Sequence, residues 1–311
     1  MVRTVALLFA LAGIAGSASA QSAKELGGFK PEDFGALGAQ PAIVVLSPGT
    51  GELRTLRYHL AAGTTYKVAM TAQGSASAEM NGQALPSQKA PGFKFTQLVT
   101  VLQSNENESR LEATVKGEVA DPGTLDAAAL ERVRKELGAL EAVRLHYTVT
   151  NRGVVEDSRF DAKGEISPAL RERLQESTEL SFSLPEDPVG VGAKWRALRQ
   201  MRHGGLTMYQ VLTVAVAKFE DAVVDLDVEL EQFVPQQRYA VPGQAPNVPA
   251  EAHGHSKGKG STQLDLSAPG SRGSMSIDGD LTMSVQADPQ KPTEVKTHMQ
   301  LRMQSELEKM P

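Results

Sequence analysis

The chain has 311 residues, a formal net charge of −5 and no cysteine. Disulfides and thiol catalysis are therefore excluded, and the mild acidity argues against a nucleic-acid partner. Aromatic residues make up only 5% of the chain, so a core has to be built mainly from Val, Leu, Ala and Met.

Residues 1–20 have the composition of a secretory signal peptide. Arg3 supplies the positive end, residues 5–14 the apolar run, and Ala-Ser-Ala at 18–20 the small-residue cleavage site. We expect cleavage after Ala20 and export to the periplasm or the extracellular space. The apolar run is too short to span a membrane, and no later stretch approaches the ~20 apolar residues that a transmembrane segment needs.

Residues 21–50 are rich in Gly, Pro and Ala, and we expect an extended or disordered lead-in there. Antiparallel hairpins are predicted next, because short polar turns separate runs in which apolar and polar residues alternate. The first of these runs begins at Leu56, Tyr58 and Leu60, and others cover residues 66–70, 93–102 and 111–115.

Two helices interrupt the strand pattern. The first covers residues 126–140, with Asp126 as its cap and with Leu130, Val133 and Leu137 in its apolar stripe. The second covers residues 167–177, opens with Ser-Pro, and places Leu170 and Leu174 inward. A further hairpin, residues 143–160, lies between them.

The stretch from residue 180 to 216 joins the two runs of strands. It contains the only tryptophan, Trp195, which we interpret as a core anchor beside a corner made by Pro185, Pro188 and two glycines. The strand that follows, residues 208–219, is apolar in both of its phases, which predicts that both of its faces are covered.

The remaining chain adds strands at 224–231, 262–266, 274–285 and 293–307. Residues 235–254 hold four prolines and no periodicity, and we interpret them as a long Pro-rich loop. Together these elements predict a mainly β (α+β) fold: a large curved antiparallel sheet or half-barrel of roughly a dozen strands, with two helices packed on one face. Residues 51–308 form either a single β-rich domain or two lobes that meet near 184–195.

One segment resembles a known family. Leu184-Pro185, Pro188-Val189, Gly192 and Trp195 match the pattern LP-x-x-PV-x-x-G-x-x-W of a family of exported bacterial proteins and lipoproteins of unknown function. Residues 58–70 and the Gly-rich strands between 258 and 285 are similar to the same family, so the resemblance covers about residues 51–308. It implies an exported β protein and brings no catalytic residue. Lipoprotein members carry a lipidated cysteine, which this chain lacks. The overall plan is similar, more loosely, to half-barrel carriers of lipids and lipoproteins.

Most chemistries lack support in the sequence. His253 and His255, with Glu251 beside them, form an incomplete ligand set, and the acidic row 225–231 is typical of a solvated strand face. Residues 254–260 miss the phosphate-loop spacing by one position, and no Gly-x-Ser-x-Gly elbow occurs. We therefore expect no enzyme activity, no cofactor and no metal.

Methionine gives the sharper hypothesis, because its flexible side chain suits a lining that accepts irregular hydrocarbon. We expect an exported, non-enzymatic envelope protein that binds a lipid or another apolar ligand in a cavity between sheet and helices. The candidate cavity residues are Met70, Trp195, Met208, Met283, Met299, Met303, Leu130, Val133, Leu137, Leu170 and Leu174. The alternative is a structural or protein–protein interaction protein of the envelope with a filled core, in which methionine only fills gaps.

Overall fold

A computed structural model describes residues 26–163, 182–203, 205–238, 250–285 and 293–311. These residues form sixteen strands, one α-helix and two short 3-10 helices. The helices are η1 (Pro31–Phe34), α1 (Ala127–Ala139) and η2 (Leu140–Ala142). The strands are β1 (Ala42–Ser47), β2 (Thr50–Arg54), β3 (Thr65–Met80), β4 (Gln83–Ala84), β5 (Gln88–Lys89), β6 (Gly92–Ser104), β7 (Glu108–Asp121), β8 (Val143–Thr150), β9 (Val155–Ala162), β10 (Val189–Val191), β11 (Lys194–His203), β12 (Leu206–Glu220), β13 (Val223–Arg238), β14 (Ala250–Asp265), β15 (Ser271–Val285) and β16 (Thr293–Lys309).

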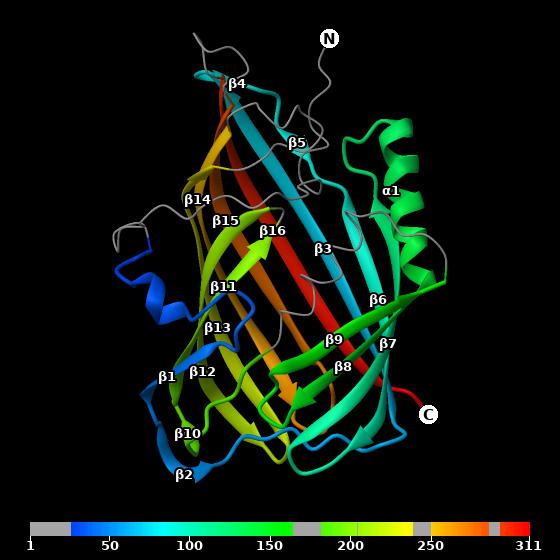
Figure 1. Ribbon diagram of the computed structural model, residues 1–311, viewed down its shortest axis with the longest axis vertical. Helices are drawn as coiled ribbons and strands as arrows, with labels where there is room; N and C mark the ends of the chain where they lie inside the picture. The colour runs from blue at the N-terminus through cyan, green and yellow to red at the C-terminus, as the bar shows by residue number, and fades with distance from the viewer. Residues whose placement is uncertain (1–25, 164–181, 204, 239–249, 286–292) are drawn as a thin grey trace.

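Fourteen of these strands form one antiparallel sheet. Its main path runs β1-β11-β12-β13-β14-β15-β16-β3-β6-β7-β8-β9, with β4 and β5 paired to β3, while β10 and β2 form a separate pair. The predicted large antiparallel sheet is confirmed, with more strands than the predicted dozen. The sheet does not close on itself, because β1 and β9 are the two ends of this path (Figure 1).

The long strands follow the period of two that their sequence predicts. In β13, Leu226, Val228 and Leu230 are buried, whereas the intervening Asp227 and Glu229 are exposed. We call the face that carries Leu226 and Trp195 the inner face, and the opposite one the outer face. Residues paired directly across an antiparallel ladder share a face, so the register assigns a face to each side chain along the sheet.

Trp195 lies in the core on the inner face. Its side chain is 1% exposed, it pairs with Val214 of β12, and its indole nitrogen donates a hydrogen bond of 3.2 Å to the carbonyl oxygen of Ser183. A buried indole needs such a partner for its N–H. The interpretation of Trp195 as a core anchor is therefore confirmed.

Residues 56–60 cross the inner face without belonging to a strand. The Tyr58 amide donates to the carbonyl of Asn151 and the His59 amide to that of Leu266, both at 2.8 Å. Tyr58 packs against two core clusters, one built largely on β3 and β6–β8 and the other largely on β11–β14. The two halves of the sheet therefore curve around this segment, and the inner face is concave.

The prediction of a strand at 56–60 was wrong. The alternation is real, because Leu56 and Leu60 are buried. These two side chains enter different clusters of a curved sheet instead of one face of a ladder.

The outer face of β11–β13 is covered by residues 26–39. Leu26 and Phe34 pack there with Leu198, Tyr209 and Phe233, and the rings of Phe34 and Tyr209 meet edge to face at 5.0 Å. This explains why β12 is apolar in both phases, as predicted, although the cover on this face is not a predicted helix. The part of the lead-in from residue 26 onward, expected to be extended or disordered, contains η1 and the paired strand β1.

Helix α1 begins where its sequence predicts. The Asp126 carboxylate accepts a hydrogen bond of 2.7 Å from the amide of Ala129, which caps the helix. The helix contacts β7, where Leu137 and Leu140 lie against Gly117. Gly117 pairs with Phe95, which pairs with Met70, so the helix packs on the inner face over β7, near an end of the sheet, as predicted for the first of the two helices. The predicted second helix, with Leu170 and Leu174, lies outside the described residues.

Strands extend into both ends of the predicted Pro-rich loop 235–254. β13 continues to Arg238 through a register shift between Val234 and Gln237, and β14 already begins at Ala250. A bulge lets Pro235 sit within a strand although it has no amide to donate. In the described part of the chain, no helix is long and apolar enough to cross a bilayer.

Candidate functional site

The inner face carries a row of half-buried apolar side chains at the centre of the sheet. We call Ile277 of β15, Met299, Leu301 and Met303 of β16, and Ala72 of β3 the apolar strip. The register brings them together, because Ile277 pairs with Leu301 and Met303 pairs with Ala72. Each of the five is only partly buried.

The apolar strip has little cover from the described chain. None of its residues belongs to the four core clusters, and no described element outside the sheet makes extensive contact with β15 or β16. Side chains of this kind would gain free energy from burial, at about 25 cal/mol for each Å² of apolar surface removed from water. The strip is therefore an apolar surface suited to a further partner or ligand.

Small residues flank the strip along β14. Gly258 faces inward, and a Cβ atom there would lie 3.1 Å from Ile277 and 3.3 Å from Leu230. A larger residue at this position would push against the strip or against β13. The glycine thus keeps the inner face open between the strip and the filled core.

A polar row crosses the same face, from β11 to β14. Arg199, Gln210, Gln232 and Ser256 occupy paired positions on successive strands. Nε of Arg199 donates to Oε1 of Gln210 at 2.6 Å, and the Ser256 hydroxyl donates to Oε1 of Gln232 at 3.0 Å. Gln210 is 6% exposed, so the polar row is built into the sheet and is not a solvated fringe.

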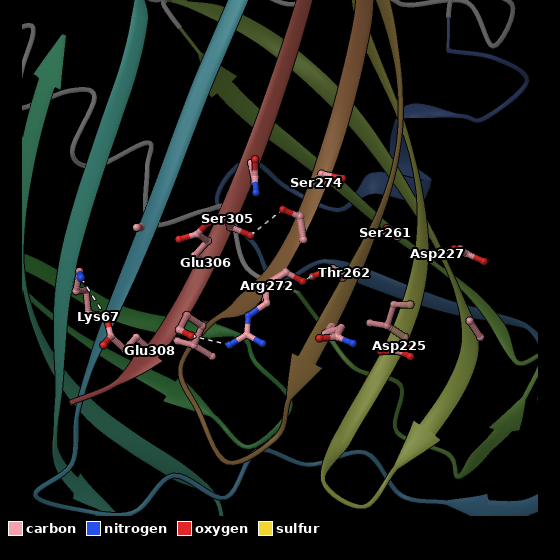
Figure 2. Close-up of a pocket in the computed structure, with 17 residues that line it drawn as sticks. Lys67, Asp225, Asp227, Ser261, Thr262, Arg272, Ser274, Ser305, Glu306 and Glu308 are labelled. Atoms are coloured by element: carbon pink, nitrogen blue, oxygen red, sulfur yellow. Dashed lines mark hydrogen bonds and ion pairs between the residues drawn. The ribbon is translucent and has the colours of Figure 1, made fainter. Parts of the chain in front are cut away.

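The outer face holds a polar groove of about 820 Å³ across β13–β16 and β3 (Figure 2). Nζ of Lys67 pairs with the Glu308 carboxylate at 3.1 Å, and Arg272 donates to the carbonyl of Leu307 at 3.0 Å. These contacts tie the strands together at the lower end of the sheet. The groove offers polar contacts. The contacts of its lining residues do not bring a nucleophile, a general base and a general acid within reach of one another.

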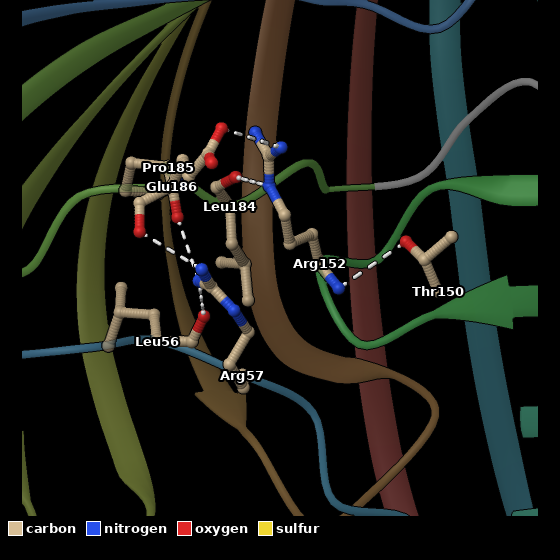
Figure 3. A network of polar contacts seen from close by, with 7 residues as sticks. All are labelled: Leu56, Arg57, Thr150, Arg152, Leu184, Pro185 and Glu186. Carbon is tan, nitrogen blue, oxygen red and sulfur yellow. Dashed lines mark hydrogen bonds and ion pairs between the residues drawn. The ribbon is translucent and has the colours of Figure 1, made fainter. Parts of the chain in front are cut away.

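A network of arginines connects three segments that are far apart in the sequence (Figure 3). Arg57 donates to the carbonyls of Leu56, Pro185 and Glu186 at 2.7, 2.9 and 2.9 Å. Arg152 donates to the carbonyl of Leu184 at 3.1 Å. Burial and the nearby charge of Arg152 lower the pKa of Arg57, while Glu186 acts in the opposite direction. The arginines replace water at carbonyls that no strand satisfies, which is a structural role.

The candidate cavity residues divide into separate groups. Met299 and Met303 lie on the apolar strip, and Met70 also faces inward but is 37% exposed. Met208 and Met283 meet in a cluster at the other end of β12–β15. Trp195 belongs to the filled core. Leu130, Val133 and Leu137 are half-buried on α1, and the structure does not bring them to the strip.

The two weak metal candidates have structural explanations. His255 lies in β14 and stacks on Phe233 with ring centroids 4.9 Å apart. In the acidic row, Glu229 and Glu231 pair with Lys259 and Lys257, each at 3.1 Å. The hydrogen bond from Lys259 lowers the pKa of Glu229. No group of three His, Asp or Glu within the described ranges could hold a metal ion.

Sequence analysis missed the polar row and the arginine network. Arg199 and Gln210 each follow an apolar residue within their strands, and only the paired register reveals that they face inward. The one available signal was the spacing from Trp195. Trp195, Ala197 and Arg199 are two residues apart along the strand, so they lie on the same face.

Comparisons with known proteins identify no family. No family model matches the chain, and no curated protein matches it. Among solved structures, the chain is similar to OccK11 (OpdR) of Pseudomonas aeruginosa, with 7% identity over 81% of this chain and 100% of that one, at a TM-score of 0.24. It is also similar to OpdQ of Pseudomonas aeruginosa, with 6% identity over 78% of this chain and 99% of that one, at a TM-score of 0.23. These likenesses are too weak to carry an argument.

Proposed function

We propose that the protein is an exported, non-enzymatic component of the bacterial cell envelope that binds a lipid or another apolar ligand on the inner face of its sheet. The apolar strip is the observation that carries this proposal. Its methionines adapt to irregular hydrocarbon, and it lies on the concave face of the sheet, a shape that suits an apolar ligand. The site is displaced from the position expected beneath α1, because α1 packs on β7.

The absence of catalysis is part of the proposal. The described groups whose pKa is shifted have structural causes: Lys89 lowers the pKa of Asp121, and desolvation raises the pKa of Tyr147. Perturbed groups of an active site would instead converge in a pocket. Export rests on residues 1–20, which lie outside the described residues.

Ligand binding is tested by adding a fluorescent polyunsaturated fatty acid to the purified protein and by extracting co-purified lipid for mass spectrometry. We expect saturable binding, weakened about tenfold or more by Leu301→Gln combined with Met303→Gln, because two polar amides would enter the apolar contact. Arg302→Gln is the matched control, since Arg302 lies between them on the outer face. Binding that is absent, or equally weak in both variants, would refute the proposal.

The alternative, an interaction protein of the envelope, has one specific observation in its favour. Among the described strands, β1 forms one edge of the sheet, and Val44 and Leu46 on it are 47% and 45% exposed. Such an edge can accept a strand from another chain. If this is the function, the protein should carry no extractable lipid. Val44→Lys should abolish association with the other chain, and Leu301→Gln should leave that association intact.

A further inference from the structure

Two tyrosines lie in the concavity close to the apolar strip. Tyr147 is on the inner face of β8, where it pairs with the buried Leu111, and Tyr58 is on the segment that crosses this face. Both tyrosines pack against the core cluster built largely on β3 and β6–β8. Tyr58 also packs against the cluster built largely on β11–β14.

Both of these clusters border the apolar strip. Met275 packs against the β11–β14 cluster and pairs with Met303 of the strip. Leu307 packs against the other cluster, and it lies on the same face of β16 as Met303, about 13 Å away at roughly 3.3 Å per residue. An acyl chain that spans one leaflet of a bilayer core covers about 15 Å. One lipid molecule can therefore contact the strip and Tyr58 together.

The hydroxyl groups of Tyr58 and Tyr147 make no hydrogen bond with the described residues. Tyr66 shows the contrast within the same cluster, because its hydroxyl donates a hydrogen bond of 2.8 Å to the carbonyl of Ser267. Tyr58 and Tyr147 are half-buried, and neither hydroxyl oxygen is among the side-chain atoms that are sealed from solvent without a partner. Each hydroxyl is therefore accessible to a water molecule or a ligand in the concavity.

The surroundings of the two phenols are uncharged. Desolvation raises the pKa of both groups, and no charged side chain of the described residues contributes to either shift. A charged ligand group placed there would lose its hydration without gaining an ion pair, which is costly. A carbonyl or hydroxyl group needs only the hydrogen bonds that a phenol can make. The position therefore favours an uncharged head group.

We propose that the ligand is a neutral lipid, whose ester carbonyl or hydroxyl group hydrogen-bonds to the phenols of Tyr58 and Tyr147 while its hydrocarbon chain lies over the apolar strip. This inference rests on the proposed function and specifies the ligand class of the same site. The strip supplies most of the affinity, and the two phenols determine which head group is preferred and in which direction the ligand lies.

The test uses three fluorescent probes: cis-parinaric acid, its methyl ester, and diphenylhexatriene, a hydrocarbon without a head group. At about pH 8, where a free carboxyl group is ionised, the ester should bind about tenfold or more tightly than the acid. Tyr58→Phe combined with Tyr147→Phe should weaken ester binding about tenfold, because two hydrogen bonds are lost. The same double variant should change diphenylhexatriene binding less than about twofold, because the apolar contact remains.

Tyr66→Phe is the matched control. It removes a phenol hydroxyl from the same cluster, but this hydroxyl already has a backbone partner. The variant should therefore keep the ester affinity within about twofold of the unmodified protein.

The outcomes separate the proposed function from the ligand class. If neither the ester nor diphenylhexatriene binds the unmodified protein, the proposed function fails. If the acid binds as tightly as the ester, or if the double variant keeps the ester affinity, the apolar site stands and the neutral-lipid assignment is overturned. Equal weakening of the ester and of diphenylhexatriene also overturns it, because the phenols would then support the fold and not the head group. The comparison of ester with acid needs no variant, so it decides the charge of the head group even if the double variant does not fold.

Discussion

At the scale of single residues, arginine side chains donate the hydrogen bonds to backbone carbonyls that a neighbouring strand donates elsewhere in the sheet. The carbonyls of Leu56, Pro185 and Glu186 lie on segments that cross the concavity and have no ladder of their own, and Arg57 satisfies all three. Pro185 contributes to the need, because a proline can accept a hydrogen bond but cannot donate one. The guanidinium therefore fastens two crossing segments that are far apart in sequence.

Arg57→Ala should lower the free energy of unfolding by about 2 kcal/mol, since partly buried carbonyls would lose their donors. Urea unfolding followed by tryptophan fluorescence measures it, because Trp195 is the only tryptophan in the chain. Arg134→Ala is the control: Arg134 pairs with Glu131 at 2.9 Å on an exposed helix face, where such a pair contributes less than about 0.5 kcal/mol. A similar loss in both variants would contradict the role of Arg57.

Tyr58 gives a prediction for alkaline pH. Desolvation raises its pKa well above the ordinary value of about 10. The folded state therefore keeps the neutral phenol while the unfolded chain ionises, so the stabilisation is complete below about pH 10 and is lost as the pH rises further.

We expect the free energy of unfolding to fall more steeply between about pH 9 and pH 11 in the unmodified protein than in Tyr58→Phe. Absorbance of the native protein at alkaline pH should also show fewer ionised tyrosines than the unfolded chain. Equal slopes for the two proteins would mean that Tyr58 ionises freely in the fold.

At the scale of elements, the turn between β8 and β9 supports the crossing segments. Gly153 lies in this turn with φ of 79°, and a Cβ there would lie 2.2 Å from the carbonyl oxygen of Phe182 and 2.8 Å from the ring of Tyr58. Backbone strain and a close approach both require glycine at this position.

Gly153→Ala should cost about 3 kcal/mol or more, and Gly63→Ala only about 1 kcal/mol. Gly63 has nearly the same φ, 80°, but no atom within 4 Å of its added Cβ. The difference between their free energies of unfolding, measured by chemical denaturation, gives the cost of the clash, because both variants share the backbone strain. If they cost the same, the crossing segments do not press on this turn.

The same elements show what the sequence predicts and what it does not. β13 and β16 were predictable, because apolar and polar residues alternate along each of them and the apolar ones share one buried face of the ladder. Residues 56–60 alternate just as well and form no strand, since alternation only records which side chains are buried. β14 was predicted too short, because inward glycines such as Gly254 and Gly258 erase the apolar signal of its inner phase. The polar row was missed for a related reason. The register across four strands decides which face of the sheet each of its side chains occupies, and the sequence of a single strand does not contain that register.

At the scale of the whole molecule, curvature brings the two ends of the sheet together. β1 and β9 are eleven strand steps apart along the main path of the sheet, yet Nε2 of Gln40, just before β1, donates to Oε1 of Glu156 in β9 at 2.6 Å. We call this contact the β1–β9 seam. The seam encloses the inner face from the side. The concavity itself follows from the twist that accumulates over many strands.

The seam can be tested by joining it, because the chain contains no cysteine and a Gln40→Cys, Glu156→Cys variant has only two thiols. A short bismaleimide should link them within one molecule, at a yield that does not change on dilution. The link closes a loop of more than a hundred residues, and the chain-entropy model then predicts a stability gain of about 4 kcal/mol. Each single-cysteine variant, treated in the same way, controls for modification alone. A flat sheet would keep the thiols far apart and give only dimers that disappear on dilution, and in that case neither the concave inner face nor a ligand site upon it would survive.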